Sequence, residues 1–486
     1  MISKPLLFLA ACMTAASCIS VATAGDLPPD NPFASPSPLL FQTPQFVRIR
    51  DEHFRPAFVE GMRLQLAEMD AITAQTAEPT FENTITAIEK SGALLTRVRN
   101  VFSNLTSSHK NEALQAIETE LAPLQAAHSD NILLNRRLFA RVSSLWDRRA
   151  ALGLTTEQQE VLKQHYEGFV RAGARLTDEQ QTRIRALNEK ISLLETKFEE
   201  HLLALLKERA VIVDSAAELD GMSDLDISAA AEAAKARGLD GKYLLEISNT
   251  TRVPILTSLN NRSVRQKVWQ ASAQRGLGQN GGLDNRPLVL ELAKLRAERA
   301  QLLGFKSHAA FKLQNQMAQT PEAARKMLTD LAPGVMERVR QEARDLEQIM
   351  AAGKDRHELA PWDWEYYAEK LRKSRFDVDE SQVKPYFELN SVLENGVFHT
   401  MNLLHGVQFR ERTDLPIFHP DVRVFDVFEK DGKQIGLFFF DPFRRETKRG
   451  GAWMSSFVDQ SGLLKERPVV VNTLNIPRPG AGEPAL

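Results

Sequence analysis

The sequence contains almost no cysteine, since only Cys12 and Cys18 occur among its 486 residues. Both lie within residues 1–24, which resemble a secretory signal peptide: Lys4 precedes an apolar stretch, and Ala22-Thr23-Ala24 forms a small-x-small cleavage site. Cleavage there would leave no cysteine, which excludes disulfides, thiolate zinc sites and a cysteine nucleophile. The leader therefore predicts an exported, periplasmic protein.

A second interpretation of the leader stays open. Leu9-Ala10-Ala11-Cys12 resembles a lipoprotein cleavage box, which would leave a lipidated Cys12 and anchor the protein to a membrane. The apolar run before Cys12 is short, so ordinary cleavage is the preferred interpretation. The leader is too short for a retained membrane span, and we expect none.

The sequence also has no excess of charge of either sign. Its 61 Lys and Arg residues nearly balance its 63 Asp and Glu residues, for a formal net charge of −2. Nucleic-acid binding needs clustered positive charge, whereas the two signs are interspersed here. No nucleic-acid partner is therefore expected.

Motifs for metal binding or nucleophilic catalysis are missing. No two of the ten histidines are four residues apart, so no H-E-x-x-H zinc motif is present, and His357-Glu358 is followed by Pro361 where the second His would stand. Gly276 to Gly281 matches G-x-G-x-x-G, but a helical pattern precedes it instead of a strand, which favours a loop. We predict no catalytic or metal-binding residue within this chain.

Helical periodicity dominates the first four hundred residues. Within Asp178–Leu205, apolar residues from Ile184 to Leu205 recur at spacings of three and four, with Thr177 or Asp178 as N-cap. Similar patterns predict helices over 55–76, 81–104, 111–127, 156–172, 227–237, 261–274, 287–303, 321–351, 363–374 and 391–405. A mainly α-helical fold is expected.

From Arg423 to Leu486 the sequence changes to β alternation. Asp431-Gly432 between two apolar runs is a strong hairpin signal, and further strands are expected around Gly450–Met454 and Pro468–Asn475. Arg444, Arg445, Lys448 and Arg449 cluster beside the third of these strands. The preferred interpretation of this cluster is a solvated strand edge, and the alternative is a site for an acidic ligand group.

Several longer motifs resemble one known family. In chain order they are Pro79–Thr84, Phe169–Gly173, Pro361–Tyr367, Lys384–Phe387 and Lys448–Met454. Together they resemble the peptidyl-dipeptidase (dipeptidyl carboxypeptidase) branch of the thimet oligopeptidase family of zinc metallopeptidases.

The resemblance implies a two-lobed, neurolysin-like helical body with a deep channel and a small β-sheet near the C-terminus. It also implies Zn²⁺ as cofactor and the release of dipeptides from the C-terminus of short unstructured peptides. Residues 25–255 would form an N-terminal helical region, and residues 256–486 the first part of the catalytic domain. The zinc helix of the family would follow Leu486, so we expect a truncated, inactive chain that binds no zinc itself. If the chain is soluble, we expect a monomer.

The resemblance suggests a substrate-binding role for only two residues. Gly451 and Ala452 would lie on a sheet edge, where an extended peptide can add through main-chain hydrogen bonds. The alternative for Gly450-Gly451 is a simple bulge. The competing function for the whole chain is a non-catalytic peptide-binding or scaffold protein that uses the helical channel.

Overall fold

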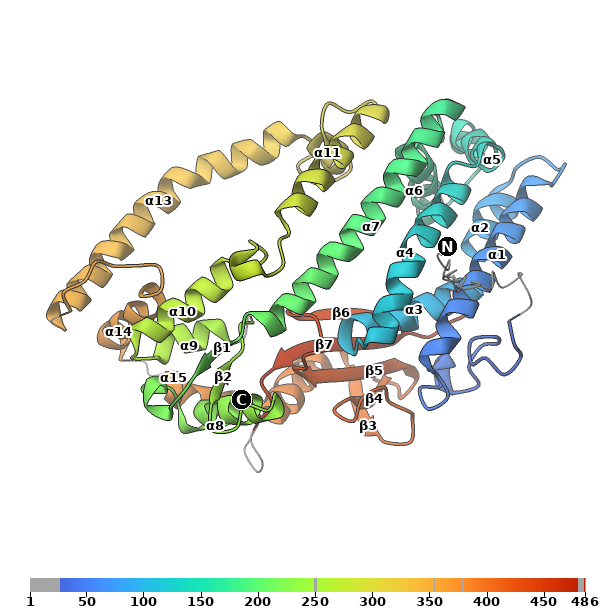
Figure 1. Ribbon diagram of the computed structural model, residues 1–486. Helices are drawn as coiled ribbons and strands as arrows, with labels where there is room; N and C mark the ends of the chain where they lie inside the picture. The colour runs from blue at the N-terminus through green and yellow to red at the C-terminus, as the bar shows by residue number, and fades with distance from the viewer. Residues whose placement is uncertain (1–26, 249–250, 354, 378–379, 480–484, 486) are drawn as a thin grey trace, which may run out of the picture.

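The computed structural model describes residues 27–248, 251–353, 355–377, 380–479 and 485. The predicted signal peptide, residues 1–24, lies outside them together with Cys12 and Cys18. Helices make up most of the described chain and a small sheet lies near its C-terminal end (Figure 1), which confirms the mainly α-helical prediction. Among the described residues, no helix is both long and apolar enough to cross a bilayer.

The N-terminal helices form the first of two helical lobes (Figure 1). Their bounds are α1 Phe54–Thr73, α2 Ala87–Glu89, α3 Ala93–Ser108, α4 Glu112–Leu133, α5 Arg136–Asp147, α6 Thr156–Ala172 and α7 Asp178–Glu208. Thr177 caps α7 as predicted, since its side chain accepts a hydrogen bond from the Gln180 amide. The single helix predicted over 81–104 is wrong, because Gly92 adopts a φ of +72° and separates α2 from α3.

The second lobe follows α7 and contains shorter elements as well as one long helix. It comprises β1 Val211–Val213, α8 Asp224–Ala236, β2 Tyr243–Leu245, α9 Arg252–Ser258, α10 Arg262–Ala273, α11 Arg286–Leu302, α12 His308–Leu313, α13 Pro321–Ala352, α14 Trp364–Phe376, α15 Glu380–Val383, α16 Leu389–Ser391 and α17 His399–His405. The predicted domain boundary between residues 255 and 256 falls within α9, and it stays a prediction.

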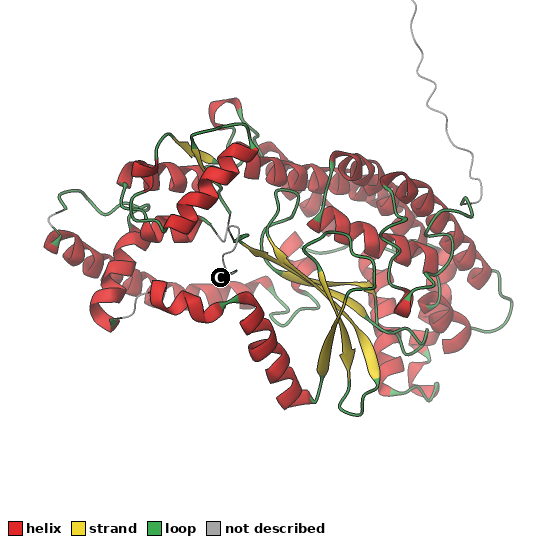
Figure 2. Cartoon of the chain, turned by 90° about the horizontal axis from the view of Figure 1, so that it is seen from below, coloured by secondary structure: helices red, strands yellow, loops and turns green. Residues whose placement is uncertain are grey.

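A five-stranded sheet lies below α4 and α7 in the view of Figure 1, and Figure 2 shows it from below. Its strands are β3 Gln408–Arg412, β4 Arg423–Phe428, β5 Gln434–Phe443, β6 Trp453–Val458 and β7 Val469–Ile476, in the spatial order β3-β4-β5-β7-β6. All neighbours are antiparallel except β5 and β7, which run parallel. The predicted hairpin joins β4 to β5, and Gly432 in its turn has a φ of +82°.

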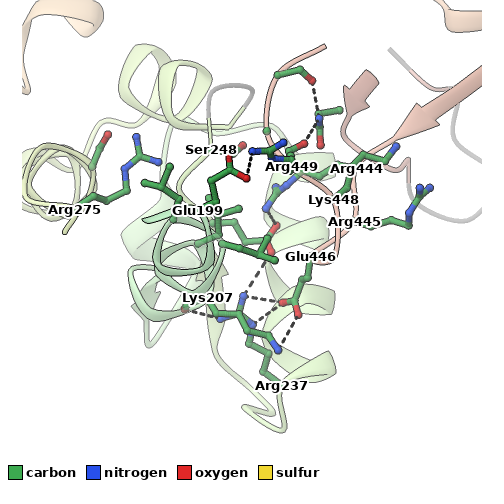
Figure 3. A pocket seen from close by; sticks show the side chains of 18 residues that line it. Glu199, Lys207, Arg237, Ser248, Arg275, Arg444, Arg445, Glu446, Lys448 and Arg449 are labelled. Atoms are coloured by element: carbon green, nitrogen blue, oxygen red, sulfur yellow. Dashed lines mark hydrogen bonds and ion pairs between the residues drawn. The ribbon is translucent and has the colours of Figure 1, made fainter. Parts of the chain in front are cut away.

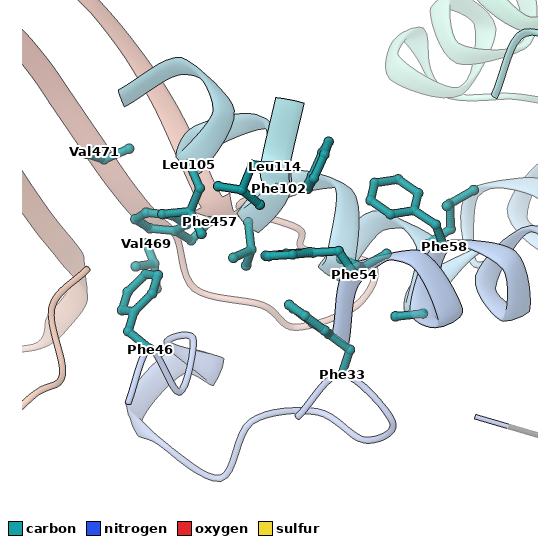
Figure 4. Close-up of a cluster of buried hydrophobic side chains, with 14 of the residues drawn as sticks. Phe33, Phe46, Phe54, Phe58, Phe102, Leu105, Leu114, Phe457, Val469 and Val471 are labelled. Carbon is teal, nitrogen blue, oxygen red and sulfur yellow. The ribbon is translucent and has the colours of Figure 1, made fainter. Parts of the chain in front are cut away.

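Both faces of this sheet are covered, because alternate side chains of each strand point to opposite sides. On one face, Phe439, Phe457, Val469 and Val471 join the aromatic rings of α1 and α3 in the largest apolar cluster (Figure 4). On the other face, Phe425, Phe438 and Phe440 pack with Leu393 and Phe398, which precede α17. The sheet is thereby fixed between the two lobes.

Candidate functional site

Strand β6 forms one edge of the five-stranded sheet, with β7 as its neighbour. The carbonyl oxygen of Ser456 accepts a hydrogen bond from Asn104 Nδ2 of α3 at 3.0 Å, so the Ser456 backbone faces away from β7. Backbone groups alternate in direction along a strand. Met454 therefore also turns its N–H and carbonyl toward the open edge, and Ala452 does so just before the strand begins.

The segment that leads into β6 contains both residues singled out by the sequence. The carbonyl oxygen of Gly451 accepts a hydrogen bond from Asn475 Nδ2 of β7 at 2.6 Å, so it points inward, as the alternation requires. Ala452 is exposed, and Met454 is 68% exposed. No hydrogen bond joins the backbone of Ala452 or Met454 to a side chain or loop of the described chain. The open backbone positions are thus Ala452 and Met454, whereas Gly451 faces β7.

Gly451 contributes in another way. Its φ is +100°, a conformation that residues with a side chain rarely adopt, and open space lies where a Cβ would stand. The glycine allows the chain to turn from the preceding loop into β6 without a side chain at that point.

A buried lysine holds this preceding loop in place. Lys448 Nζ lies 2.9 Å from Asp441 Oδ1 and donates to the carbonyl oxygens of Phe443 at 2.5 Å and Leu474 at 3.1 Å. Burial lowers the pKa of Lys448 to about 8, although Asp441 favours the charged form. Arg445 donates two hydrogen bonds to the same carboxylate, at 2.8 and 2.6 Å. The solvated-edge interpretation is therefore wrong for Lys448, which is buried, and for Arg445, whose side chain is only 9% exposed.

A cavity of about 540 Å³ opens where this loop meets both lobes (Figure 3). Its walls come from the C-terminal part of α7, the ends of α8 and α10, the segment after β2, the loop 444–451 and Asn475 of β7. Leu202, which the periodicity places on the apolar face of α7, is 44% exposed and lines this cavity together with Leu203 and Leu206. Gly450 and Gly451 also line it, so the cavity adjoins the beginning of β6.

Positive side chains predominate around the cavity. Seven cationic side chains line it, namely Lys207, Arg237, Arg275, Arg444, Arg445, Lys448 and Arg449. Only three carboxylates line it, namely Glu199, Glu246 and Glu446. The second interpretation of the basic cluster at residues 444–449 was a site for an acidic ligand group. The cavity beside the cluster has the positive charge that such a site requires.

The described residues do not supply a metal site. No group of three or more His, Cys, Asp or Glu side chains within the described part of the chain is placed to hold a metal ion. His109 and His419 come together, with ring centroids 5.3 Å apart, but burial lowers the pKa of both and Arg445 lies beside them. His357, the one partial zinc motif, lies outside any helix. The donor set required for the zinc ion that the resemblance implies is not met by these residues.

Sequence reasoning did not find Met454 or Arg275. The direction of the Met454 backbone depends on which side of β6 faces β7, and Arg275 follows α10, far from the sheet in sequence. The only signal for Met454 was its position two residues after Ala452, which places both on the same side of an extended strand.

Comparisons with known proteins agree with this architecture. The model of Peptidase family M3 matches residues 255–486. The dipeptidyl carboxypeptidase of Escherichia coli (strain K12) is 42% identical over 456 residues, which are 94% of this chain and 67% of that protein. Its counterpart in Salmonella typhimurium is 41% identical with the same shares. Oligopeptidase A of Escherichia coli is 31% identical over 463 residues, 94% of this chain and 67% of that protein. The chain belongs to peptidase family M3.

Proposed function

We propose that this chain serves the zinc-dependent hydrolysis of short, unstructured peptides, with release of dipeptides from their C-terminus. Peptidases of family M3 are metallopeptidases, and the named relatives are peptidases. The higher identity to dipeptidyl carboxypeptidase, 42% against 31% for oligopeptidase A, supports the dipeptide-releasing activity. We also propose that the 486 residues by themselves bind peptides without cleaving them, as expected from a sequence without an H-E-x-x-H zinc motif.

The main structural support for this proposal is the open edge of β6. An extended peptide that lies along the edge can form main-chain hydrogen bonds with Ala452 and Met454, whose backbone groups face outward. Such bonds do not depend on the side chains of the peptide, which suits an enzyme that accepts many sequences. Gly451 leaves room beside this edge because it has no side chain.

Peptide binding at this edge is tested by Met454→Pro. Proline lacks the outward N–H, and it is tolerated on an edge strand where the N–H faces solvent. We expect the variant to keep its fold by circular dichroism while its affinity for an N-terminally labelled pentapeptide, measured by fluorescence anisotropy, falls about tenfold, as expected for the loss of one well-formed hydrogen bond.

Ser455→Pro is the matched control, because the Ser455 backbone faces β7 and the substitution should destabilise the sheet. If Met454→Pro binds the peptide as tightly as the unchanged chain does, peptide addition to β6 is wrong.

A direct assay tests the claim of inactivity. The purified chain is incubated with an N-terminally blocked tripeptide that carries either a free or an amidated C-terminus, with and without added Zn²⁺. We expect no dipeptide in any sample. Release of a dipeptide only when zinc is added would refute the claim, whereas binding without cleavage would also fit the scaffold alternative.

We further propose that the protein is exported to the periplasm after cleavage of residues 1–24. The small-x-small site at Ala22-Thr23-Ala24 supports this location. Mass spectrometry of the mature N-terminus separates it from lipidation, since a chain that begins at a modified Cys12 would contradict cleavage after Ala24.

A further inference from the structure

We propose that the cavity between α4, α6, α7, α11 and α12 binds a free α-amino acid with an apolar side chain. Asp130 contacts the ammonium group of this ligand and Arg299 contacts its carboxylate. The inference does not depend on a peptide along β6, because this cavity and the one at the beginning of β6 share no lining residue.

Helices of both lobes form the walls of this cavity. In Figure 1, α7 runs between α4 and α11, and side chains of these three helices line the cavity together with residues of α6 and α12. The volume is about 460 Å³, within the range of ~300–1,000 Å³ that is usual for ligand pockets. Five large apolar side chains belong to the walls, namely Leu133, Ile184, Ile191, Leu303 and Phe311. An apolar group of a ligand can therefore be buried here.

Asp130 of α4 supplies negative charge to the wall. The residue is only 5% exposed, and its Oδ1 accepts a hydrogen bond from Asn188 Nδ2 at 2.8 Å. No Lys, Arg or His side chain in the described part of the chain forms an ion pair with it. Burial raises the pKa of Asp130, although the hydrogen bond from Asn188 favours the charged form. A ligand ammonium group would supply the positive charge that this buried carboxylate lacks.

Arg299 of α11 supplies positive charge to the same wall. Its Nη1 donates to Asn188 Oδ1 at 3.2 Å, and its buried Nε has no hydrogen-bond partner among the described residues. Glu195, the other carboxylate of the wall, pairs with Arg296 at 2.7 Å. Burial lowers the pKa of Arg299, since within the described residues no carboxylate forms an ion pair with it. A ligand carboxylate would match this guanidinium in charge and in hydrogen bonding.

Asn188 fixes the spacing between these two charges. Its carboxamide donates to Asp130 and accepts from Arg299, so the two charged groups lie one amide group apart. The amide presents its donor and its acceptor on a single carbon atom. An α-amino acid likewise carries its ammonium group and its carboxylate on one carbon, so it can contact Asp130 and Arg299 together. A dipeptide separates its charges by a further residue and fits this spacing less well.

Phe311 of α12 offers a surface for the apolar side chain of the ligand. The guanidinium carbons of Arg171 and Arg299 lie 4.5 and 5.8 Å from the centre of its ring. Arg171 also donates to the Phe311 carbonyl oxygen at 3.0 Å and to Gln314 Oε1 at 2.8 Å. These contacts hold the ring at the cavity, where an aliphatic side chain can pack against it.

Equilibrium dialysis of the purified chain against radiolabelled L-leucine tests the inference. Three unlabelled competitors each change one feature of leucine: leucinamide has no carboxylate, 4-methylpentanoate has no ammonium group, and leucyl-leucine has its charges further apart. We expect leucinamide and 4-methylpentanoate to compete about tenfold less well than leucine, the factor for the loss of one charged hydrogen bond. Leucyl-leucine should also compete less well than leucine.

Two substitutions separate the two contacts. Arg299→Gln should abolish the preference for leucine over leucinamide and retain the preference over 4-methylpentanoate, whereas Asp130→Asn should do the reverse. Arg299→Lys, which keeps the charge, should retain part of the first preference. Arg137→Gln is the matched control and should keep both preferences, because Arg137 is an exposed residue of α5 that does not line the cavity. A ratio between two competitors is insensitive to a general loss of folding.

The unchanged chain must bind leucine for the inference to hold. No binding at millimolar leucine would overturn it and would leave the β6 proposal unaffected, because the two cavities have separate walls. Equal competition by leucine and its two analogues, or tighter binding of leucyl-leucine, would refute an α-amino acid as the ligand. A preference that survives the substitution expected to remove it would refute the role of the substituted residue.

Discussion

Replacing Lys448 by methionine should destabilise the sheet and the loop beside the cavity. The lysine side chain is fully buried, and its Nζ contacts one carboxylate oxygen and three carbonyl oxygens, those of Asp441, Phe443 and Leu474. Methionine has a similar length but no donor, so these acceptors would remain buried with one partner fewer. Removal of one member of a buried ion pair typically costs ~3–5 kcal/mol.

The lower end of that range applies here. Asp441 keeps both of its hydrogen bonds from Arg445, so its charge is not left without a partner. We therefore expect the free energy of unfolding to fall by about 3 kcal/mol. The measurement is equilibrium unfolding in urea at pH 7, followed by tryptophan fluorescence, in which Trp453 of β6 reports on the sheet.

Lys433→Met is the matched control, since Lys433 is exposed in the turn between β4 and β5. A surface change of this kind should alter the free energy of unfolding by less than about 0.5 kcal/mol. If Lys448→Met costs no more than Lys433→Met, the buried lysine does not stabilise the loop and the reasoning is wrong.

Two further predictions concern charge and pH. Asp363→Asn should lower the free energy of unfolding by about 3 kcal/mol at pH 7, because Asp363 is fully buried and accepts hydrogen bonds from Arg262 and Arg265. Burial raises the pKa of Asp363, but hydrogen bonds from these two arginines lower it by more, so the net shift is downward. The stabilisation due to Asp363 is therefore present above pH ~4 and is lost as the pH falls below that value. Urea unfolding between pH 3 and 5 should show a shallower acid dependence for Asp363→Asn than for the unchanged chain. The pKa of Lys448 is about 8 in the folded protein against ~10.4 in the unfolded chain, so the unfolded state binds more protons between these values, and the stability due to Lys448 should rise with pH there. A difference in unfolding free energy between the unchanged chain and Lys448→Met that stays constant from pH 7.5 to 10 would contradict that pKa.

Local patterns were sufficient to predict much of the fold. The hairpin turn at Gly432 and the N-cap at Thr177 depend on residues within a few positions of each other, so sequence alone identifies them. Strand β3 was missed because Gln408–Arg412 contains one apolar residue and shows no alternation. Helix α5 was missed although Asn135 caps it and Leu138, Val142 and Leu145 are buried at helical spacing.

The candidate site was only partly predictable, because its geometry depends on contacts between distant segments. The sequence singled out Gly451 and Ala452, but the direction of each carbonyl follows from Asn104 and Asn475, which lie in other elements. The burial of Lys448 could not be inferred from its neighbours, since three arginines nearby suggest solvent. The cavity itself exists only where α7, α10 and the loop 444–451 meet.

The position of β7 between β5 and β6 has a consequence for the order of folding during synthesis. Strands β5 and β6 leave the ribosome first, yet neither pairs with the other in the finished sheet, because the later β7 separates them. The edge that we propose to receive peptides therefore cannot assume its final geometry until residues 469–476 have emerged. Until then, Phe439 and Phe457 have no completed sheet to pack within, so these aromatic rings stay exposed on the nascent chain.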